Sequence, residues 1–185
     1  MSASSEMPYF IKPSLQLTET QKMAAYTQAK LEIDAILANE INIILKMVTI
    51  NCVLKTYLPY YYWVGFYGVN EKQKNKLSVG PYQGTLGCLH IAFGKGVCGG
   101  VAASQKTQIV SDVHALVEGE AHITCDPNSQ SEIVVPVFDK LGKLIAVFDV
   151  DSSVPNSFDE TDKNFLEKIL HTHFVEKNLN SSYFC

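Results

Sequence analysis

The sequence predicts an α+β domain in which helices cover an antiparallel β-sheet. Three observations lead to this prediction: apolar residues at helical spacing near the N-terminus, short strand-like runs joined by turns, and an amphipathic segment near the C-terminus. The chain has 185 residues, of which 46% are hydrophobic, enough for one well-packed core. We therefore expect a single domain over residues 15–180, between a poorly ordered segment 1–14 and a tail 181–185.

Two helices are expected before the first strand. Thr18 and Gln21 match a capping box, and apolar residues then recur at helical spacing at Met23, Tyr26, Ala29 and Ile33, through Leu37. The second helix runs from about Glu40 to about Tyr57, and Pro59 stops it. Its apolar stripe, which we expect to face the core, comprises Ile41, Ile44, Leu45, Val48 and Cys52.

The remaining elements follow in order along the chain. Strand-like runs occupy residues 61–70, 76–84, 89–97, 107–112, 131–139 and 143–151, with a short helix at 97–104. The irregular segment 113–130 has a length typical of a functional lid or a disordered linker. Ser157 and Glu160 match a second capping box, and the last helix has its apolar face at Phe165, Leu166, Ile169, Leu170, His173 and Phe174.

Charge and composition exclude several classes of partner. The formal net charge of −4 gives no field that would attract nucleic acid or an anionic membrane. The first twenty residues have neither the basic start nor the apolar core of a secretory signal, and no apolar run reaches bilayer length. We therefore expect a cytoplasmic protein. Its five cysteines are an odd number without regular spacing, so they are interpreted as thiols, some of them redox-active.

The segment His122–Glu132, with Cys125 near its centre, is the main candidate for function. It carries a turn at residues 126–129 and leads directly into a β-branched run that predicts a buried strand. An isolated cysteine is usually a small buried hydrophobic residue. Here Cys88 and Cys98 flank a glycine-rich turn, and three carboxyl groups accompany them at Glu132, Asp149 and Asp151. This clustering argues for chemistry.

Two other motifs have weaker support. Gly94, Gly96 and Gly99 match a dinucleotide-binding pattern, but the neighbouring strands look antiparallel and Asp112 comes too early for the ribose contact. The glycines are better explained by a tight turn close to a ligand or to Cys98. A zinc site is also disfavoured, because no C-x-x-C pair anchors the potential ligands Cys88, His90, Cys98, His122 and Cys125. His171 and His173 are interpreted as exposed or hydrogen-bonded imidazoles.

Asp149 and Asp151 lie two residues apart in a strand, so their side chains emerge on one face. Two adjacent carboxylates repel each other unless a cation or a proton lies between them. A pocket for an ammonium group and simple solvent exposure remain alternatives, and Glu132 on the neighbouring strand favours the pocket. Trp63 and Tyr67 share a face of the first strand and either line that pocket or pack in the core.

The segments YWVGFY, LSVGPYQG, FGKGVCG, HITCD, SEIVVPV and FDVDS, in this order and spacing, resemble the free methionine-(R)-sulfoxide reductases, a branch of the GAF-domain superfamily. The resemblance covers about residues 60–170. It implies a six-stranded antiparallel sheet flanked by helices, with a ligand pocket between the sheet and the long loop. The positions that it implicates are Cys88, Cys98 and Cys125 as the reactive cysteines, Glu132, Asp149 and Asp151 as the pocket acids, and Trp63 and Tyr67 as the aromatic wall.

The departures from the family pattern remove no reacting group. Thr124 stands where alanine is usual before the cysteine, Val64 replaces alanine, and Gly100 and Val101 replace a common Thr-Ala pair. The N-terminal extension is also longer. Thr124 could change how the loop packs over the pocket.

The resemblance implies reduction of free methionine (R)-sulfoxide without a cofactor or a metal. We expect Cys125 to attack the sulfoxide sulfur and Cys88 to resolve the resulting sulfenic acid as a disulfide, with Cys98 as the alternative attacking thiol. Thioredoxin or a similar dithiol would restore the thiols. The amphipathic first helix favours a homodimer. The alternatives are a non-catalytic GAF sensor for a small molecule and a helix-mediated interaction protein.

Overall fold

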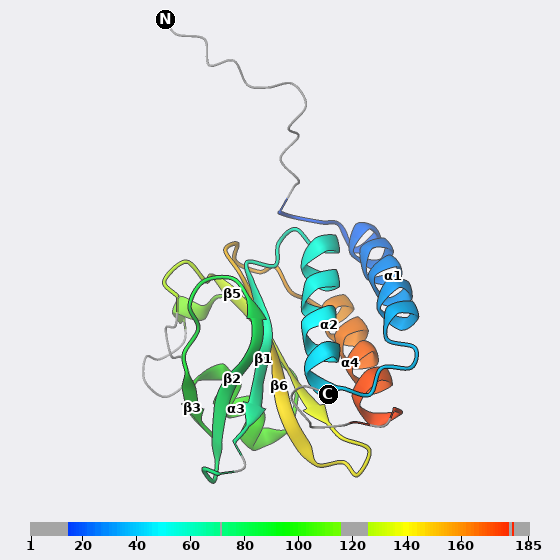
Figure 1. The fold of residues 1–185 in the computed structure, drawn as a ribbon. Coiled ribbons are helices and arrows are strands. Elements are labelled where there is room, and N and C mark those ends of the chain that lie inside the picture. The colour runs from blue at the N-terminus through cyan, green and yellow to red at the C-terminus, as the bar shows by residue number, and fades with distance from the viewer. Residues whose placement is uncertain (1–14, 71, 116–125, 178, 180–185) are drawn as a thin grey trace, which may run out of the picture.

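The computed structural model describes residues 15–70, 72–115, 126–177 and 179. Their fold, drawn in Figure 1, confirms the predicted six-stranded antiparallel sheet, with strand order β3-β2-β1-β6-β5-β4. The strands are β1 (Trp63–Val69), β2 (Lys76–Gln83), β3 (His90–Ala92), β4 (Gln108–Val110), β5 (Ser131–Phe138) and β6 (Leu144–Ser152). The helices are α1 (Glu19–Ile36), α2 (Ile43–Tyr57), α3 (Gly96–Ser104) and α4 (Glu160–Leu170), with a 3₁₀ turn at Val113–Ala115 and a π-helix at His171–Val175.

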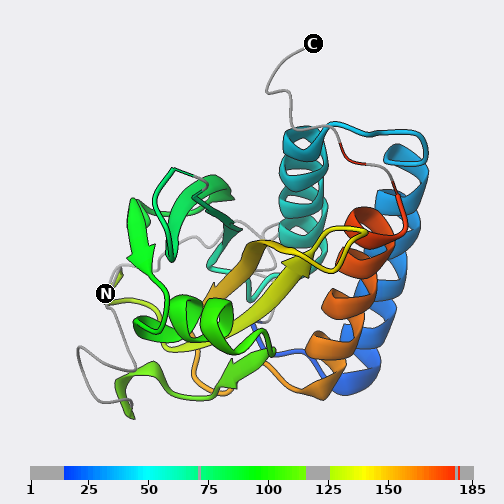
Figure 2. The same cartoon turned by 90° about the horizontal axis from the view of Figure 1, so that it is seen from below.

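The sheet separates two hydrophobic cores. Helices α1, α2 and α4 cover one face, and the short helix α3 lies on the other, as Figure 2 shows. Side chains alternate between the two faces along each strand. On β1, for example, Val64 and Phe66 pack under the three long helices, whereas Trp63 and Tyr67 join α3 on the opposite side. The side that carries α3 is the side of the candidate site.

Two predictions about local structure are corrected, and a third is confirmed. The third strand-like run ends at Ala92, because Gly94 and Gly96 adopt positive φ angles of 78° and 60° that turn the chain into α3. The capping box of α4 is formed by Asp159 and Asp162, not by Ser157 and Glu160. The box predicted for α1, between Thr18 and Gln21, is confirmed.

The buried face of α2 is also not the predicted one. Ile41, Leu45, Val48 and Cys52 are exposed, whereas Met47, Ile50 and Leu54 pack in the core. The buried face carries Lys46 and Asn51, which made it look polar in the sequence. Their side chains donate to the carbonyl oxygens of His173 and Pro81, at 2.8 Å each, so both can be buried. Met23 on α1 is likewise exposed.

The predicted core face of the last helix is confirmed. Leu166, Ile169, Leu170, His173 and Phe174 are buried. The His173 ring is hydrogen-bonded through Nε2 to Asp34, at 2.9 Å, and its Nδ1 has no partner in the described part of the chain. His171 is exposed and lies 3.2 Å from the Glu176 carboxylate.

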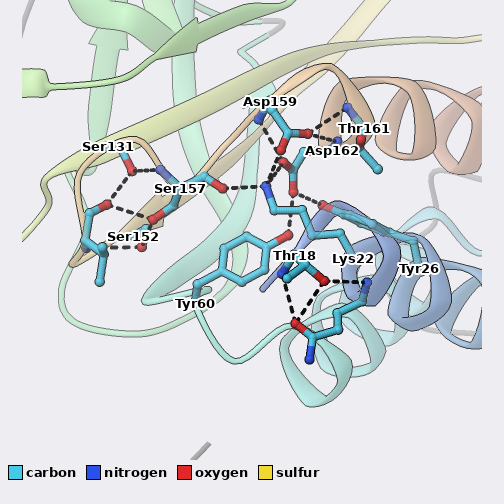
Figure 3. A network of polar contacts seen from close by, with 12 residues as sticks. Thr18, Lys22, Tyr26, Tyr60, Ser131, Ser152, Ser157, Asp159, Thr161 and Asp162 are labelled. Carbon is cyan, nitrogen blue, oxygen red and sulfur yellow. Dashed lines mark hydrogen bonds and ion pairs between the residues drawn. The ribbon is translucent and has the colours of Figure 1, made fainter. Parts of the chain in front are cut away.

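A buried polar network joins α1 to α4 on the helical side of the sheet (Figure 3). The Lys22 ammonium contacts the carboxylates of Asp159 and Asp162 and donates to the Ser157 carbonyl at 2.7 Å. Tyr26 and Tyr60 both donate to the second oxygen of Asp162. Removing one member of such a buried ion pair typically costs about 3–5 kcal/mol, because the partner charge stays buried.

This network continues to the strand ends that carry the candidate acids. Ser157 donates from its backbone to Ser131 Oγ at 3.3 Å and from its hydroxyl to Ser152 Oγ at 2.9 Å (Figure 3). Ser131 precedes Glu132 in β5, and Ser152 follows Asp151 in β6. The helical side of the sheet therefore fixes the backbone that presents both acids on the opposite side. The described residues contain no helix that is both long and apolar enough to cross a membrane.

Candidate functional site

The structure brings six of the eight predicted site residues to one cavity between the sheet and α3. They are Trp63 and Tyr67 of β1, Cys98 of α3, Glu132 of β5, and Asp149 and Asp151 of β6. Cys125 lies outside the described residues, as does His122. Cys88 does not line the cavity and is disulfide-bonded.

Strand register explains why the acids meet. β6 lies between β1 and β5, so that Trp63, Asp151 and Glu132 stand opposite one another in one row across the sheet. Asp149 stands in the next row on the same face, opposite Gly65. Side chains at directly paired positions on one face are about 5 Å apart. The Asp-x-Asp spacing in β6 and the position of Glu132 at the start of β5 thus determine the cluster.

Cys98 reaches this cluster from the first turn of α3. The glycine-rich turn at residues 94–96 reverses the chain, and Gly99 packs so closely on β3 that a Cβ there would lie 2.2 Å from the Ala92 carbonyl oxygen. The interpretation of these glycines as a tight turn is confirmed. The buried Cys98 sulfur lies within 4.8 Å of a carboxylate oxygen of Asp149 and of one of Glu132.

Among the described residues, Glu132 and Asp149 are buried without a matching cation, and Asp151 beside them is half-buried. Glu132 and Asp149 are 7% and 6% exposed, and burial raises the pKa of each, that of Asp149 to about 7. Burial also raises the pKa of Asp151. One carboxylate oxygen of Glu132 and one of Asp149 lie within 4.8 Å of each other, and this proximity adds to the rise in the pKa of Glu132. Lys95 is the one basic residue among the described lining residues, and it is exposed.

The same burial acts on the thiol. Desolvation raises the pKa of Cys98 well above its ordinary value, and the negative charge of Asp149 and Glu132 raises it further. Burial likewise raises the pKa of Tyr67, with Asp149 the next cause. The cavity therefore favours bound cations and disfavours additional anions.

Aromatic rings form one wall of the cavity. The Trp63 indole stacks between Tyr67, at a centroid distance of 5.7 Å, and Tyr82, at 5.2 Å. Its Nε1 donates to the Thr85 carbonyl at 3.0 Å. Tyr82, which was not predicted from the sequence, stands opposite Gly65 on β2 and stacks on the Trp63 ring without itself lining the cavity.

Sequence reasoning also missed Asp126, which lines the cavity next to the undescribed segment 116–125. Its carboxylate accepts hydrogen bonds from the hydroxyls of Thr85 and Tyr62 and from the backbone of Asn128. These bonds, that of Thr85 first, lower the pKa of Asp126. The available signal was the Asp-Pro-Asn turn, since an aspartate at such a position commonly accepts from the backbone two residues later.

The five potential zinc ligands weighed from the sequence do not form one site among the described residues. Cys88 is disulfide-bonded, and His90 Nδ1 is hydrogen-bonded to Ser78 Oγ at 3.0 Å. The group in the described part of the chain whose ligand atoms do converge is Cys98, Glu132 and Asp149.

Comparison with known proteins supplies independent information. Residues 59–172 match the model of the GAF domain family. The chain is 46% identical over 107 residues to the free methionine-R-sulfoxide reductase of Saccharomyces cerevisiae, a match that spans 58% of each chain. It is 32% identical to the Escherichia coli free methionine-R-sulfoxide reductase over 80% of this chain and 86% of that one. The crystal structure of free methionine-R-sulfoxide reductase from Neisseria meningitidis in complex with its substrate superposes with a TM-score of 0.76 at 38% identity, covering 87% of this chain and 95% of that one.

The packing around Gly65 makes a testable prediction. A Cβ at Gly65 would lie 2.4 Å from Tyr82 Cβ and 2.7 Å from the Trp63 ring, so Gly65→Ala must displace the aromatic wall. We expect a loss of about 1–3 kcal/mol in the free energy of unfolding, as for other overpacked sites, and a shifted emission of Trp63, the single tryptophan. Urea unfolding followed by fluorescence measures both.

Gly68→Ala is the matched control on the same strand. The nearest atom to a Cβ at Gly68 is 4.0 Å away, so this variant should keep the wild-type emission and stability. Equal behaviour of the two variants would contradict the described packing of Trp63.

Proposed function

The chain belongs to the GAF domain family and, within it, to the free methionine-R-sulfoxide reductases, which are oxidoreductases, and we propose that it reduces free L-methionine (R)-sulfoxide to methionine. The observation that carries this proposal is a cavity in which buried carboxyl groups, a thiol and stacked aromatic rings meet without a matching cation. A free amino acid supplies the missing cation through its ammonium group. The apolar methylene and methyl groups of its side chain fit against the aromatic wall.

We assign the attacking thiol to Cys125. Its thiolate attacks the sulfoxide sulfur, the S–O bond breaks, and the oxygen passes to the cysteine as a sulfenic acid while methionine leaves. The sulfoxide is reduced by two electrons and the cysteine sulfur is oxidised by two. Cys98 is the weaker candidate, because burial and the neighbouring carboxyl groups raise the pKa of its thiol.

Cys88 then acts as the resolving thiol. It condenses with the sulfenic acid of Cys125, which forms the S–S bond and releases water. The ability of Cys88 to form a disulfide supports this role. A dithiol reductant, for which we propose thioredoxin in the cytoplasm, would return both cysteines to thiols by exchange.

The acids would bind the substrate and help the chemistry. Asp149 and Asp151 face the ammonium, and the raised pKa of Glu132 makes it a proton donor for the departing oxygen. The ammonium also offsets the negative charge that would otherwise oppose thiolate formation. A methionine sulfoxide within a protein has no free ammonium, which accounts for a preference for the free amino acid.

The cysteine roles are tested with Cys125→Ser, Cys88→Ser and Cys98→Ser. We expect Cys125→Ser to release no methionine from the (R)-sulfoxide in a single turnover. Cys88→Ser should complete one turnover but not sustain turnover with thioredoxin, and Cys98→Ser should keep most of the activity. Rapid quench followed by chromatography of methionine measures all three.

Cys52→Ser is the control, because Cys52 is exposed on α2. Full single-turnover release by Cys125→Ser would end the assignment. Counting thiols separates the reductase from a GAF sensor, because the substrate should remove two thiols from a reductase and none from a sensor.

The ammonium contact is tested with a substrate that lacks it. N-acetyl-methionine (R)-sulfoxide should be turned over at least tenfold less efficiently, and Glu132→Gln or Asp149→Asn should raise KM for the free sulfoxide about 10–100-fold, since each tenfold change is about 1.4 kcal/mol. Glu167→Gln, on the exposed side of α4, should leave KM unchanged. Equal kcat/KM for the acetylated and free substrates would contradict the ammonium site.

We further propose that the protein is a homodimer that pairs through α2. The exposed apolar residues Ile41, Leu45, Val48 and Cys52 are spaced by four, three and four positions, the spacing of a coiled-coil seam. None of the four is charged, so a second copy of the same face would bring no like charges together. A twofold pairing of identical faces is the commonest oligomer.

Leu45→Glu tests this pairing. It places a charge in the middle of the seam, and we expect the dimer to dissociate at micromolar concentration in sedimentation velocity. Leu141→Glu is the control, because Leu141 is 84% exposed in the β5–β6 turn, away from α2. A monomeric wild-type protein, or a Leu45→Glu variant that remains dimeric, would overturn the proposal.

A further inference from the structure

One group of side chains in the cavity has the composition of a metal site. The Cys98 sulfur and one carboxylate oxygen each of Glu132 and Asp149 all lie within 4.8 Å of one another. They come from three elements, α3, β5 and β6, that strand pairing and the glycine-rich turn hold together. All three side chains are buried. This set shares one residue, Cys98, with the zinc ligands weighed from the sequence.

A second observation points to a bound cation. Asp149 Oδ1 is buried and has no hydrogen-bond partner in the described part of the chain. An unsatisfied buried acceptor typically costs about 1–3 kcal/mol, and more when it is charged. The oxygen lies on a side chain that is 94% buried and that lines the cavity.

The sulfur determines which cations fit. An ammonium group gains little from a neighbouring thiol, because sulfur is a weak hydrogen-bond acceptor. Zn²⁺ and similar ions bind thiolate at about 2.3 Å and carboxylate oxygen at about 2.0–2.2 Å, which places tetrahedral ligands about 3.5 Å apart. Movements of about 1 Å by the three side chains would reach that geometry.

We propose that, in the absence of substrate, Cys98, Glu132 and Asp149 bind one thiophilic divalent cation such as Zn²⁺. The thiol, and any carboxyl group that is protonated in the unliganded cluster, loses its proton to solvent on binding, and no electrons are transferred. The fourth position faces the cavity. The cation occupies the carboxylates that the proposed function gives to the substrate ammonium, so metal and substrate exclude each other. The site does not use Cys88 and therefore persists when Cys88 is disulfide-bonded.

Direct titration tests the site without using turnover. The oxidised protein, in a Cys52→Ser, Cys185→Ser background, is titrated with Zn²⁺ against a chromophoric chelator and with Cd²⁺, whose thiolate complexes absorb in the ultraviolet. We expect one ion per chain, a Cd–thiolate band, and displacement of Zn²⁺ by free methionine. Cys98→Ser should remove the band, and both Cys98→Ser and Asp149→Asn should weaken Zn²⁺ binding at least tenfold.

A control variant and a folding check accompany the titration. Glu167→Gln should bind Zn²⁺ as the background protein does, and circular dichroism checks that each variant folds. A Cd–thiolate band that survives Cys98→Ser, or the absence of Zn²⁺ binding at micromolar concentration, would overturn the proposal. Binding that is lost with Cys98 but not displaced by methionine would overturn the mutual exclusion. Because no step is catalytic, a failure of the proposed reductase activity would appear separately, in the methionine-release assay.

Discussion

The close burial of the two carboxyl groups of Glu132 and Asp149, with half-buried Asp151 beside them, is the constraint on which the rest of this structure depends. Like charges in a low-dielectric site cannot all be ionised at once, so the cluster of Glu132, Asp149 and Asp151 must hold protons or a cation. Without a ligand, the raised pKa values favour the protonated, uncharged form of these carboxyl groups and so relieve the repulsion. A cationic ligand is the other solution, and it replaces protons with a charge that the cavity is arranged to recognise.

The opposite face of the sheet provides an internal comparison. There Asp162 is fully buried, but Lys22 contacts one of its oxygens and two tyrosines donate to the other. The contacts of Asp162 with Lys22 and Tyr26 join α1 to α4. The same chain thus buries one carboxylate with its cation, where the contact is structural, and leaves others without one, where a ligand can enter. The difference between complete and incomplete pairing distinguishes the two roles.

Much of the fold and part of the site could be predicted from the sequence. The Asp-x-Asp spacing placed Asp149 and Asp151 on one face because side chains alternate in any strand, and the hairpin with β5 brought Glu132 beside them. The buried face of α2 could not be predicted, because α2 is apolar on nearly all sides and the buried positions Lys46 and Asn51 find backbone partners only in the folded chain. Tyr82 and Asp126 were missed for the same reason: their contacts join segments that are distant in sequence.

The two proposals assign different roles to two cysteines: Cys98 binds a cation, and Cys125 attacks the sulfoxide. A nucleophilic cysteine must be ionised, yet the carboxyl groups that would hold an ammonium oppose ionisation of any thiol beside them. Cys98 lies within that cluster, its sulfur within 4.8 Å of the Glu132 and Asp149 oxygens, which suits a ligand or a neutral thiol better than a nucleophile. Under the proposed assignment of attack to Cys125, the reacting thiol would ionise after the ammonium has neutralised the acids. Binding of the free amino acid would then have to precede attack. The carboxyl groups that select the substrate would thus also control when the thiol can ionise.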